Sequence, residues 1–249
     1  MLTTIKRLVP PAAKERLRPL RSVISSTLNA GHAVECPVCA GRFQRFLPYR
    51  GRSGARCPRC RALERQRRLM LYLWRQTDLF SGAPKRMLHV APERYLQSYF
   101  RQIPSIDYLS GDIASPLAMI RLDVTALGFR DASFDVILCS HVLEHVSDDR
   151  AAMRELFRVI KPGGWGIIDV PMDPAREDTF EDWSVTEPAD RERVFGQWNH
   201  VRIYGRNYPD LLRTAGFEVN VDDYEFTPEE VTRFGLRATD HVWLCRKTA

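Results

Sequence analysis

Short apolar segments alternate with amphipathic segments along residues 85–245, and this alternation predicts a fold. Apolar runs typical of buried strands occupy residues 86–91, 106–110, 134–139, 165–170, 217–221 and 241–245. Apolar residues at helical spacing predict helices over 94–101, 148–160 and 207–215. Strands separated by helical crossovers predict an α/β fold with a mainly parallel sheet covered by helices on both faces. The last two strands are close in sequence, which allows an antiparallel pair at one edge.

The first 80 residues follow a different pattern. Residues 36–60 are rich in Cys, Gly, Pro and Arg and have almost no aliphatic periodicity, so this segment needs a metal ion or a disulfide to fold. Residues 62–77 are predicted to form an amphipathic helix that joins this segment to the rest. For residues 1–30, which are basic and interrupted by Pro10 and Pro11, three alternatives stay open: a surface helix, a helix in weak contact with a membrane surface, and a loosely docked arm.

Four cysteines can supply this cross-link. Cys36, Cys39, Cys57 and Cys60 form two C-x2-C pairs separated by seventeen residues. Each pair can present two thiolates from one tight turn, and two such turns complete a tetrahedron around structural Zn²⁺. Disulfides are the alternative, but nothing in the sequence indicates secretion. The remaining cysteines, Cys139 and Cys245, stand alone in apolar strands and are expected to be buried.

Charge divides the chain at nearly the same place. Residues 1–77 hold 17 Lys or Arg and 3 Asp or Glu, a net charge of +14, whereas residues 78–249 carry −8. We therefore predict two modules, organised as follows: a basic arm over 1–30, a zinc ribbon over 31–62, a linking helix over 63–80 and an enzyme domain over 81–249 with an insertion at 172–204. No apolar run is long enough to span a bilayer, and charged residues and prolines interrupt the N-terminus, so neither a transmembrane segment nor a signal peptide is expected. A cytoplasmic protein is the prediction.

The large domain carries an ordered set of motifs. A strand, a turn at Ala91-Pro92-Glu93 and a helix follow each other in RMLHVAPERYLQSYF, and Asp112 lies twenty residues after Pro92, behind the next strand. An acid at that distance is placed to accept hydrogen bonds from the ribose of a nucleotide-like cofactor. The segments RLDVTALGF, SFDVILCSHVLEHV, ELFRVIKPGG and WGIIDVP then follow in order.

These motifs resemble the class I S-adenosylmethionine-dependent methyltransferases, in particular the type 11-like group, over about residues 85–222. The resemblance implies a Rossmann-like, seven-stranded sheet with a reversed last strand and S-adenosyl-L-methionine as the cofactor. It further implies that His89, Ala91 and Glu93 line the methionine side of the cofactor and that Asp112 binds its ribose. Asp123 and Val124 would flank the adenine, and Ser140 completes the implied cofactor residues. The chain departs from the family in its first turn, which has Ala-Pro-Glu in place of Gly-x-Gly.

Candidate catalytic residues lie behind the fourth strand and in the insertion. His141 is the first choice to face the acceptor, with a helix-capping or packed histidine as the alternative. The run from His141 to His145 also spells the H-x-x-E-H zinc pattern of inverted metallopeptidases, an alternative that needs both histidines on one helix face. In the insertion, the residues expected to contact the acceptor are Asp182, Trp183, Gln197, His200, Arg202 and Tyr204. Of these, His200 and Tyr204 join His141 as predicted catalytic residues, and His200 with Arg202 would suit an anionic or hydroxylated acceptor.

Three functions remain open. The first is methyl transfer to a small or carrier-linked, hydroxylated or anionic acceptor. The second is methylation of RNA, held by the arginines around the ribbon, with Phe43, Phe46 and Tyr49 stacking on bases. The third is a non-catalytic, zinc-dependent nucleic-acid-binding protein. We favour the first, because the large domain is acidic and its insertion is expected to enclose a pocket.

Overall fold

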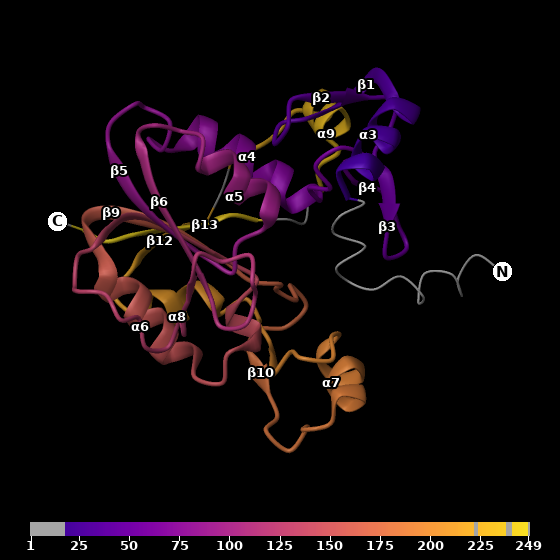
Figure 1. Ribbon diagram of the computed structural model, residues 1–249. Helices are drawn as coiled ribbons and strands as arrows, with labels where there is room; N and C mark the ends of the chain where they lie inside the picture. Colours follow the sequence, from indigo (N-terminus) through magenta and orange to yellow (C-terminus); the bar gives the residue numbers. More distant parts are fainter. Residues whose placement is uncertain (1–17, 222–223, 238–240, 249) are drawn as a thin grey trace. The chain divides into compact units, whose positions relative to one another are not determined.

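The computed structural model describes residues 18–221, 224–237 and 241–248, which belong to two compact units (Figure 1). Of the described residues, one unit takes in those up to Tyr72 together with 225–237, and the other holds those from Leu73 to Tyr224 and from His241 onward. Most of the expected basic arm lies outside the described residues. No described helix has both the length and the apolar character that a membrane crossing requires.

The larger unit is built on a seven-stranded sheet in the order β12-β13-β9-β8-β5-β6-β7. Its strands are β5 (Lys85–Val90), β6 (Ile106–Asp112), β7 (Ile120–Arg121), β8 (Phe134–Ser140), β9 (Ile160–Asp169), β12 (Glu218–Val221) and β13 (Trp243–Arg246). Strands β5 to β9 pair in parallel, and β13 runs antiparallel to both β9 and β12. The predicted α/β fold with a mainly parallel sheet and a reversed last strand is confirmed.

Helices cover both faces of this sheet, with α5 (Arg94–Phe100) on one face and α6 (Asp149–Val159) and α8 (Tyr208–Thr214) on the other (Figure 1). Helix α6 starts at Asp148, whose carboxylate accepts a hydrogen bond from the backbone N–H of Ala151 at 2.8 Å. Strands β5, β8 and β9 are buried on both faces between these helices, and this double burial explains their continuous apolar runs in the sequence.

The insertion behind β9 has its own small structure. It contains β10 (Phe180–Glu181), α7 (Pro188–Phe195) and β11 (Arg202–Ile203), and β10 pairs with β11 in antiparallel fashion. Before it in the chain, a single 3-10 turn, η1 (Leu143–His145), follows β8. The backbone N–H of Val201 donates to the carbonyl of Glu144 at 2.9 Å, so the insertion is joined to η1.

The smaller unit holds the four cysteines on two hairpins. Its elements are α3 (Arg18–Leu28), β1 (Ala30–Cys36), β2 (Gly41–Phe43), β3 (Leu47–Tyr49), β4 (Arg52–Arg56) and α9 (Pro228–Phe234), and α4 (Glu64–Gln76) continues from it into the larger unit. Strand β1 pairs with β2 and β3 pairs with β4. Helix α9 packs beside β1, and Arg233 forms an ion pair with Glu35 at 2.7 Å. No pattern in the sequence indicated that residues 225–240 complete this unit.

Candidate active site and metal centre

A cavity of about 570 Å³ lies at the carboxyl ends of β5, β6 and β8. Parallel sheets bind ligands at this end, because the loops that follow the strands meet there. The cavity is lined by Val90, Ala91, Asp112, Ile113, Leu122, Asp123, Val124, Thr125, His141, Val142, His145, Val146, Ser147, Asp148 and Asn199. Five residues predicted from the sequence therefore line the same cavity: Ala91, Asp112, Asp123, Val124 and His141.

Asp112 stands at the last position of β6, half-buried in the cavity wall. One carboxylate oxygen, Oδ1, accepts hydrogen bonds from the backbone N–H groups of Ala114 and Ser115 at 2.7 and 2.6 Å. These bonds hold the carboxylate in one orientation. The neighbouring Gly111 is packed closely against Leu122, since a Cβ on Gly111 would lie 2.5 Å from the Leu122 side chain.

Two strand ends at the cavity adopt the left-handed backbone conformation. Ala91, directly after β5, has φ +51°, and His141, directly after β8, has φ +58°. Residues with a Cβ pay a cost of about 1–2 kcal/mol in this region, and alanine has the smallest side chain that does. Ala91 thus adopts the left-handed conformation with a small side chain at a turn where the family has glycines.

Asp123 and Val124 form another part of the lining. Val124 is buried, whereas Asp123 is exposed and accepts hydrogen bonds at Oδ1 from the backbone N–H and the hydroxyl of Thr125, at 2.9 and 2.7 Å. These two hydrogen bonds lower the pKa of Asp123. The carboxylate is thus kept ionised and pinned to its own loop.

Three predicted cofactor residues are not part of the cavity lining in the described structure: His89, Glu93 and Ser140. His89 is buried within the sheet, where Nδ1 lies 2.9 Å from the Tyr108 hydroxyl and Nε2 lies 3.2 Å from Oε2 of Glu93. Contact of these residues with a cofactor stays a prediction.

Three histidines and one carboxylate gather where η1 meets the insertion. His141 Nδ1 lies 3.3 Å and His145 Nε2 lies 4.0 Å from Oε1 of the buried Glu144. The rings of His145 and His200 meet edge to face with centroids 4.8 Å apart. Burial lowers the pKa of His200, and the negative charge of Glu144 opposes this shift. His200 itself is outside the cavity lining, next to the lining residue Asn199.

The metallopeptidase alternative does not match this geometry. It needs two histidines on one face of a helix, but His141 precedes η1, which is a single turn. In the described part of the chain, Glu144 and His145 instead form a group with His200 from the insertion.

Arg202 is fully engaged inside the protein. Its side chain is 1% exposed and donates to Glu181 Oε1 at 2.6 Å, to the carbonyls of Leu143 and Ser147 at 2.8 and 3.0 Å, and to the carbonyl of Val146. The sequence suggested Arg202 as a group for an anionic acceptor, but in the structure its hydrogen bonds join the insertion to η1.

Tyr204 is also buried, and its hydroxyl donates to Asp149 Oδ2 at 2.7 Å. Burial raises the pKa of Tyr204 above its ordinary value. Its catalytic role stays a prediction, and the hydroxyl is directed to Asp149, which is not a residue of the cavity lining.

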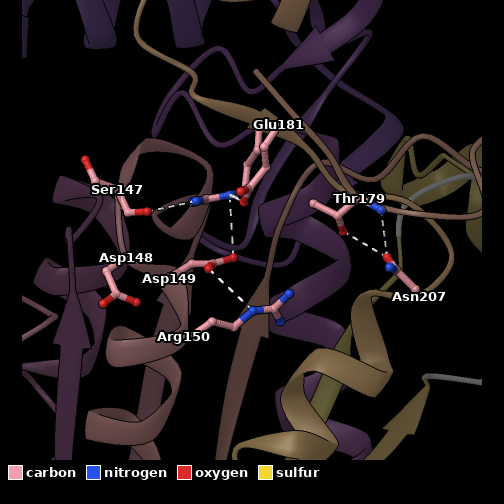
Figure 2. Close-up of a pocket in the computed structure, with 8 residues that line it drawn as sticks. Ser147, Asp148, Asp149, Arg150, Thr179, Glu181 and Asn207 are labelled. Carbon is pink, nitrogen blue, oxygen red and sulfur yellow. Dashed lines mark hydrogen bonds and ion pairs between the residues drawn. The ribbon is translucent and has the colours of Figure 1, made fainter. Parts of the chain in front are cut away.

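A second pocket, of about 490 Å³, shares Ser147 and Asp148 with the cavity. Figure 2 shows its polar walls, in which Thr179 contacts Asn207 and Asp149 contacts Arg150. The lining consists of Ser147, Asp148, Asp149, Arg150, Thr179, Glu181, Arg202 and Asn207. Because three of these are carboxylates and Arg202 is already paired, the pocket suits a polar, uncharged or cationic group better than an anion.

The four cysteines of the smaller unit converge on one point. The Sγ atoms of Cys36 and Cys60 are 3.6 Å apart, those of Cys39 and Cys57 are 3.7 Å apart, and all four lie within 4.8 Å of one another. A tetrahedral Zn²⁺ with Zn–S bonds of about 2.3 Å requires sulfur atoms about 3.8 Å apart. The cluster thus fits a zinc ion with four protein ligands.

Arg67 is the buried cation of the same unit. Its guanidinium donates to the carbonyls of Phe234 and Gly235, both at 2.6 Å, and of Ala55 at 2.9 Å and Ala62 at 3.0 Å. A zinc ion bound by four thiolates has a net charge of about −2, which a nearby buried guanidinium partly offsets.

Two of the three aromatic residues expected to stack on bases belong instead to the interior of this unit. Phe43 and Phe46 are buried, and Phe46 lies under the Arg67 guanidinium at 3.8 Å. Tyr49 is partly exposed, with Arg50 and Arg56 over its ring. Only Tyr49 of this set is therefore placed to meet a base.

Cys139 and Cys245 are buried in the sheet, as expected. Burial raises the pKa of both thiols. They are thus unreactive, in contrast to the four clustered cysteines.

Comparison with known proteins agrees with this architecture. Residues 86–168 match the family model described as a methyltransferase domain. A probable S-adenosylmethionine-dependent methyltransferase of Mycolicibacterium smegmatis is 25% identical over 57% of this chain and 47% of its own length. A ubiquinone/menaquinone biosynthesis C-methyltransferase of Cronobacter sakazakii is 40% identical over 46% of this chain and 51% of its own length. The chain thus spans about half the length of these relatives.

Among solved structures, the [4+2]-cyclase SpnF aligns with a TM-score of 0.52 and 17% identity, over 94% of this chain and 95% of that one. This similarity concerns the fold alone, since one fold supports different reactions. The match of residues 86–168, the strand order and the cavity at the strand ends agree with one another. The part of the larger unit that spans residues 86–168 is therefore similar to a methyltransferase domain.

Proposed function

We propose that this protein transfers a methyl group from S-adenosylmethionine to a small or carrier-linked, hydroxylated acceptor. The cofactor, when bound, supplies a methyl group on an electrophilic sulfonium. The cavity at the ends of β5, β6 and β8 is the observation that carries the proposal, because its volume of about 570 Å³ falls within the usual range for small-ligand sites.

The lining residues divide the cavity into regions. We assign Asp112 to the ribose hydroxyls, since its carboxylate is oriented by Ala114 and Ser115 at the end of β6. Val124 and Asp123 would flank the adenine, and Ala91 would border the methionine end, where its small side chain leaves room for the cofactor. The remaining wall, with His141, His145 and Asn199, is left for the acceptor.

On this wall the protein's task is to orient the acceptor and to exclude water. His141 faces the cavity, and its Nδ1 lies 3.3 Å from Glu144, which fixes the imidazole ring. We assign to His141 a hydrogen bond with the acceptor hydroxyl. His200 is a further candidate for contact with the acceptor, through its ring contact with His145.

Charge favours a small acceptor over RNA in the larger unit. The second pocket, next to the cavity, contains Asp148, Asp149 and Glu181, which would repel a phosphate backbone. The Cronobacter relative, named for the biosynthesis of ubiquinone and menaquinone, also points to a small-molecule acceptor. RNA remains the second candidate because the smaller unit carries exposed arginines, namely Arg42, Arg45, Arg50, Arg59 and Arg61.

We further propose that Cys36, Cys39, Cys57 and Cys60 hold a structural Zn²⁺. All four ligand positions would be occupied by the protein, so no position is left for a substrate. The ion would contribute the folding free energy that the short hairpins lack.

Calorimetry with S-adenosylmethionine, followed by RNA titrations over a salt series, tests the proposal. We expect cofactor binding that is weakened in Asp112→Ala and no salt-dependent RNA binding. Absence of cofactor binding would refute the enzyme assignment. Cofactor binding together with RNA affinity that falls steeply with salt would replace the small acceptor by RNA.

A further inference from the structure

A second group of metal-binding side chains lies beside the cavity, far in sequence from the cysteines. Glu144, His145 and His200 each offer one ligand atom, and these atoms lie within 4.8 Å of one another. Carboxylate oxygen and imidazole nitrogen are the ligands of catalytic zinc and of other divalent transition metals.

The strongest sign of a missing cation is the carboxylate of Glu144. The residue is 1% exposed, and its Oε2 atom has no hydrogen-bond partner in the described structure. The other oxygen, Oε1, lies 3.3 Å from His141 Nδ1. A buried carboxylate oxygen without a partner is rare, because burial removes the water that would solvate its charge. A bound cation would satisfy it.

His145 turns its second ring nitrogen toward the same carboxylate. Its Nδ1 lies 3.2 Å from the backbone carbonyl oxygen of Asn199, which can only accept a hydrogen bond. Nδ1 therefore carries a proton, and Nε2 is the ring nitrogen that faces Glu144, 4.0 Å from Oε1. Histidines that bind metals commonly donate their second N–H to a carbonyl or carboxylate in this way.

Hydrogen bonds of the backbone and of the Arg202 side chain hold these residues in place without a bound ion. Val201 donates to the carbonyl of Glu144, and the Arg202 side chain donates to the carbonyls of Leu143, Val146 and Ser147. These bonds fix the segment that contains His200 against η1. The three side chains are thus held by two segments more than fifty residues apart in sequence.

We propose that Glu144, His145 and His200 bind a divalent transition metal ion, with zinc as the first choice, and leave one coordination position open toward the cavity. Ligand atoms around a tetrahedral ion with bonds of about 2.0–2.1 Å are about 3.3 Å apart, so the ligand atoms, which lie within 4.8 Å of one another, need to close by up to about 1.5 Å. His145 and Asn199 line the cavity, so the open position faces the space assigned to the acceptor. An acceptor oxygen, nitrogen or sulfur would occupy it; this last clause alone rests on the proposed function.

Metal content of the full-length protein tests the site. We expect Cys36→Ser to retain one metal equivalent by mass spectrometry of the metal, and Glu144→Gln and His200→Ala in the same Cys36→Ser background to lose it. His241→Ala is the matched control, because His241 is exposed and outside the cluster, and it should retain the equivalent.

Cobalt substitution separates the two sites in the wild-type protein. Cobalt bound by cysteines shows thiolate-to-metal charge-transfer bands, whereas cobalt bound by Glu144, His145 and His200 shows only weak visible bands. Glu144→Gln should abolish the second set and weaken metal binding there at least about tenfold. It preserves the size of the side chain and removes a buried charge, so it should fold. Added Zn²⁺ should then raise the melting temperature of Cys36→Ser and leave that of Cys36→Ser with Glu144→Gln unchanged.

Metal content and cobalt spectra that are identical with and without Glu144→Gln would overturn the proposal. Calorimetry with S-adenosylmethionine is independent of this result: a protein that binds the cofactor but no metal at Glu144 refutes the metal site and leaves the proposed function in place.

Discussion

Replacing Arg202 with alanine tests how much the insertion depends on one buried side chain. The change removes the hydrogen bonds to the carbonyls of Leu143, Val146 and Ser147 and the ion pair with Glu181. It also removes the contact with Asp149, whose Oδ2 is 3.5 Å from Arg202 Nε. The insertion would then be joined to η1 mainly through backbone hydrogen bonds.

The expected loss in the free energy of unfolding follows from the carboxylates that Arg202→Ala leaves without their guanidinium partner. Removing one partner of a buried ion pair costs about 3–5 kcal/mol, chiefly because the other charge stays buried. The Glu181 side chain is 32% exposed and can be rehydrated, whereas that of Asp149 is 5% exposed and retains the Tyr204 hydroxyl and a longer contact with Arg150 at 3.8 Å. We therefore expect a loss of about 3–4 kcal/mol in the free energy of unfolding. For a unit of this size the melting temperature would fall by about 6–16 °C.

Thermal and urea unfolding of the full-length protein measure this loss, and Arg206→Ala is the control. Arg206 is exposed and donates to the carbonyl of Pro174 at 2.9 Å, so its removal should change stability by no more than about 0.5 kcal/mol. An Arg202→Ala protein within 1 kcal/mol of wild type would refute the reasoning, because a buried, fully paired guanidinium could not then be holding the insertion.

Four further outcomes are expected. Asp112→Ala should weaken S-adenosylmethionine binding in calorimetry at least about tenfold, and unchanged affinity would remove the ribose assignment. Cys36→Ser should release metal from the cysteine cluster and leave the circular dichroism of the sheet nearly intact; a full metal complement would contradict the four-cysteine site. Ala91→Val should lower the free energy of unfolding by more than about 1 kcal/mol, because a β-branched residue is disfavoured at φ +51°, whereas Ala91→Gly should be tolerated. Burial raises the pKa of Asp135, but hydrogen bonds from Lys161 and a backbone N–H outweigh it, so the pKa is lowered overall; its stabilising contribution is therefore lost as pH falls through the folded-state pKa. Asp135→Asn should flatten the acid side of the stability profile, and an unchanged profile would show that this carboxylate does not contribute.

Most strands of the sheet could be predicted from the sequence because they appear as apolar runs, which in β5, β8 and β9 are buried on both faces. The helices α5, α6 and α8 were predicted for the same kind of reason, since each has one apolar face. The two-residue strands β7, β10 and β11 were not, because a strand of that length has no periodicity to detect.

The predicted residues that line the cavity lie at or directly after strand ends, apart from Asp123 and Val124, which the family resemblance supplied. Asp112 and His141 belong to this group, since strand ends meet at one edge of the sheet. The approach of His200 to Glu144 depends on how the insertion folds, and no local pattern encodes it. Arg202 shows the limit of charge as a guide, because the sequence does not reveal whether an arginine will face a ligand or internal carbonyl groups.

The hydrogen bonds of the Arg67 guanidinium have a consequence for biosynthesis. Its guanidinium donates to the carbonyl of Phe234, 167 residues further along the chain. On the ribosome, the cysteine hairpins emerge long before these acceptors exist, so the small unit can reach its final form only after Phe234 and Gly235 have been made. A nascent chain stopped at residue 224 would keep all four cysteines and yet leave this cation without part of its hydrogen-bond partners.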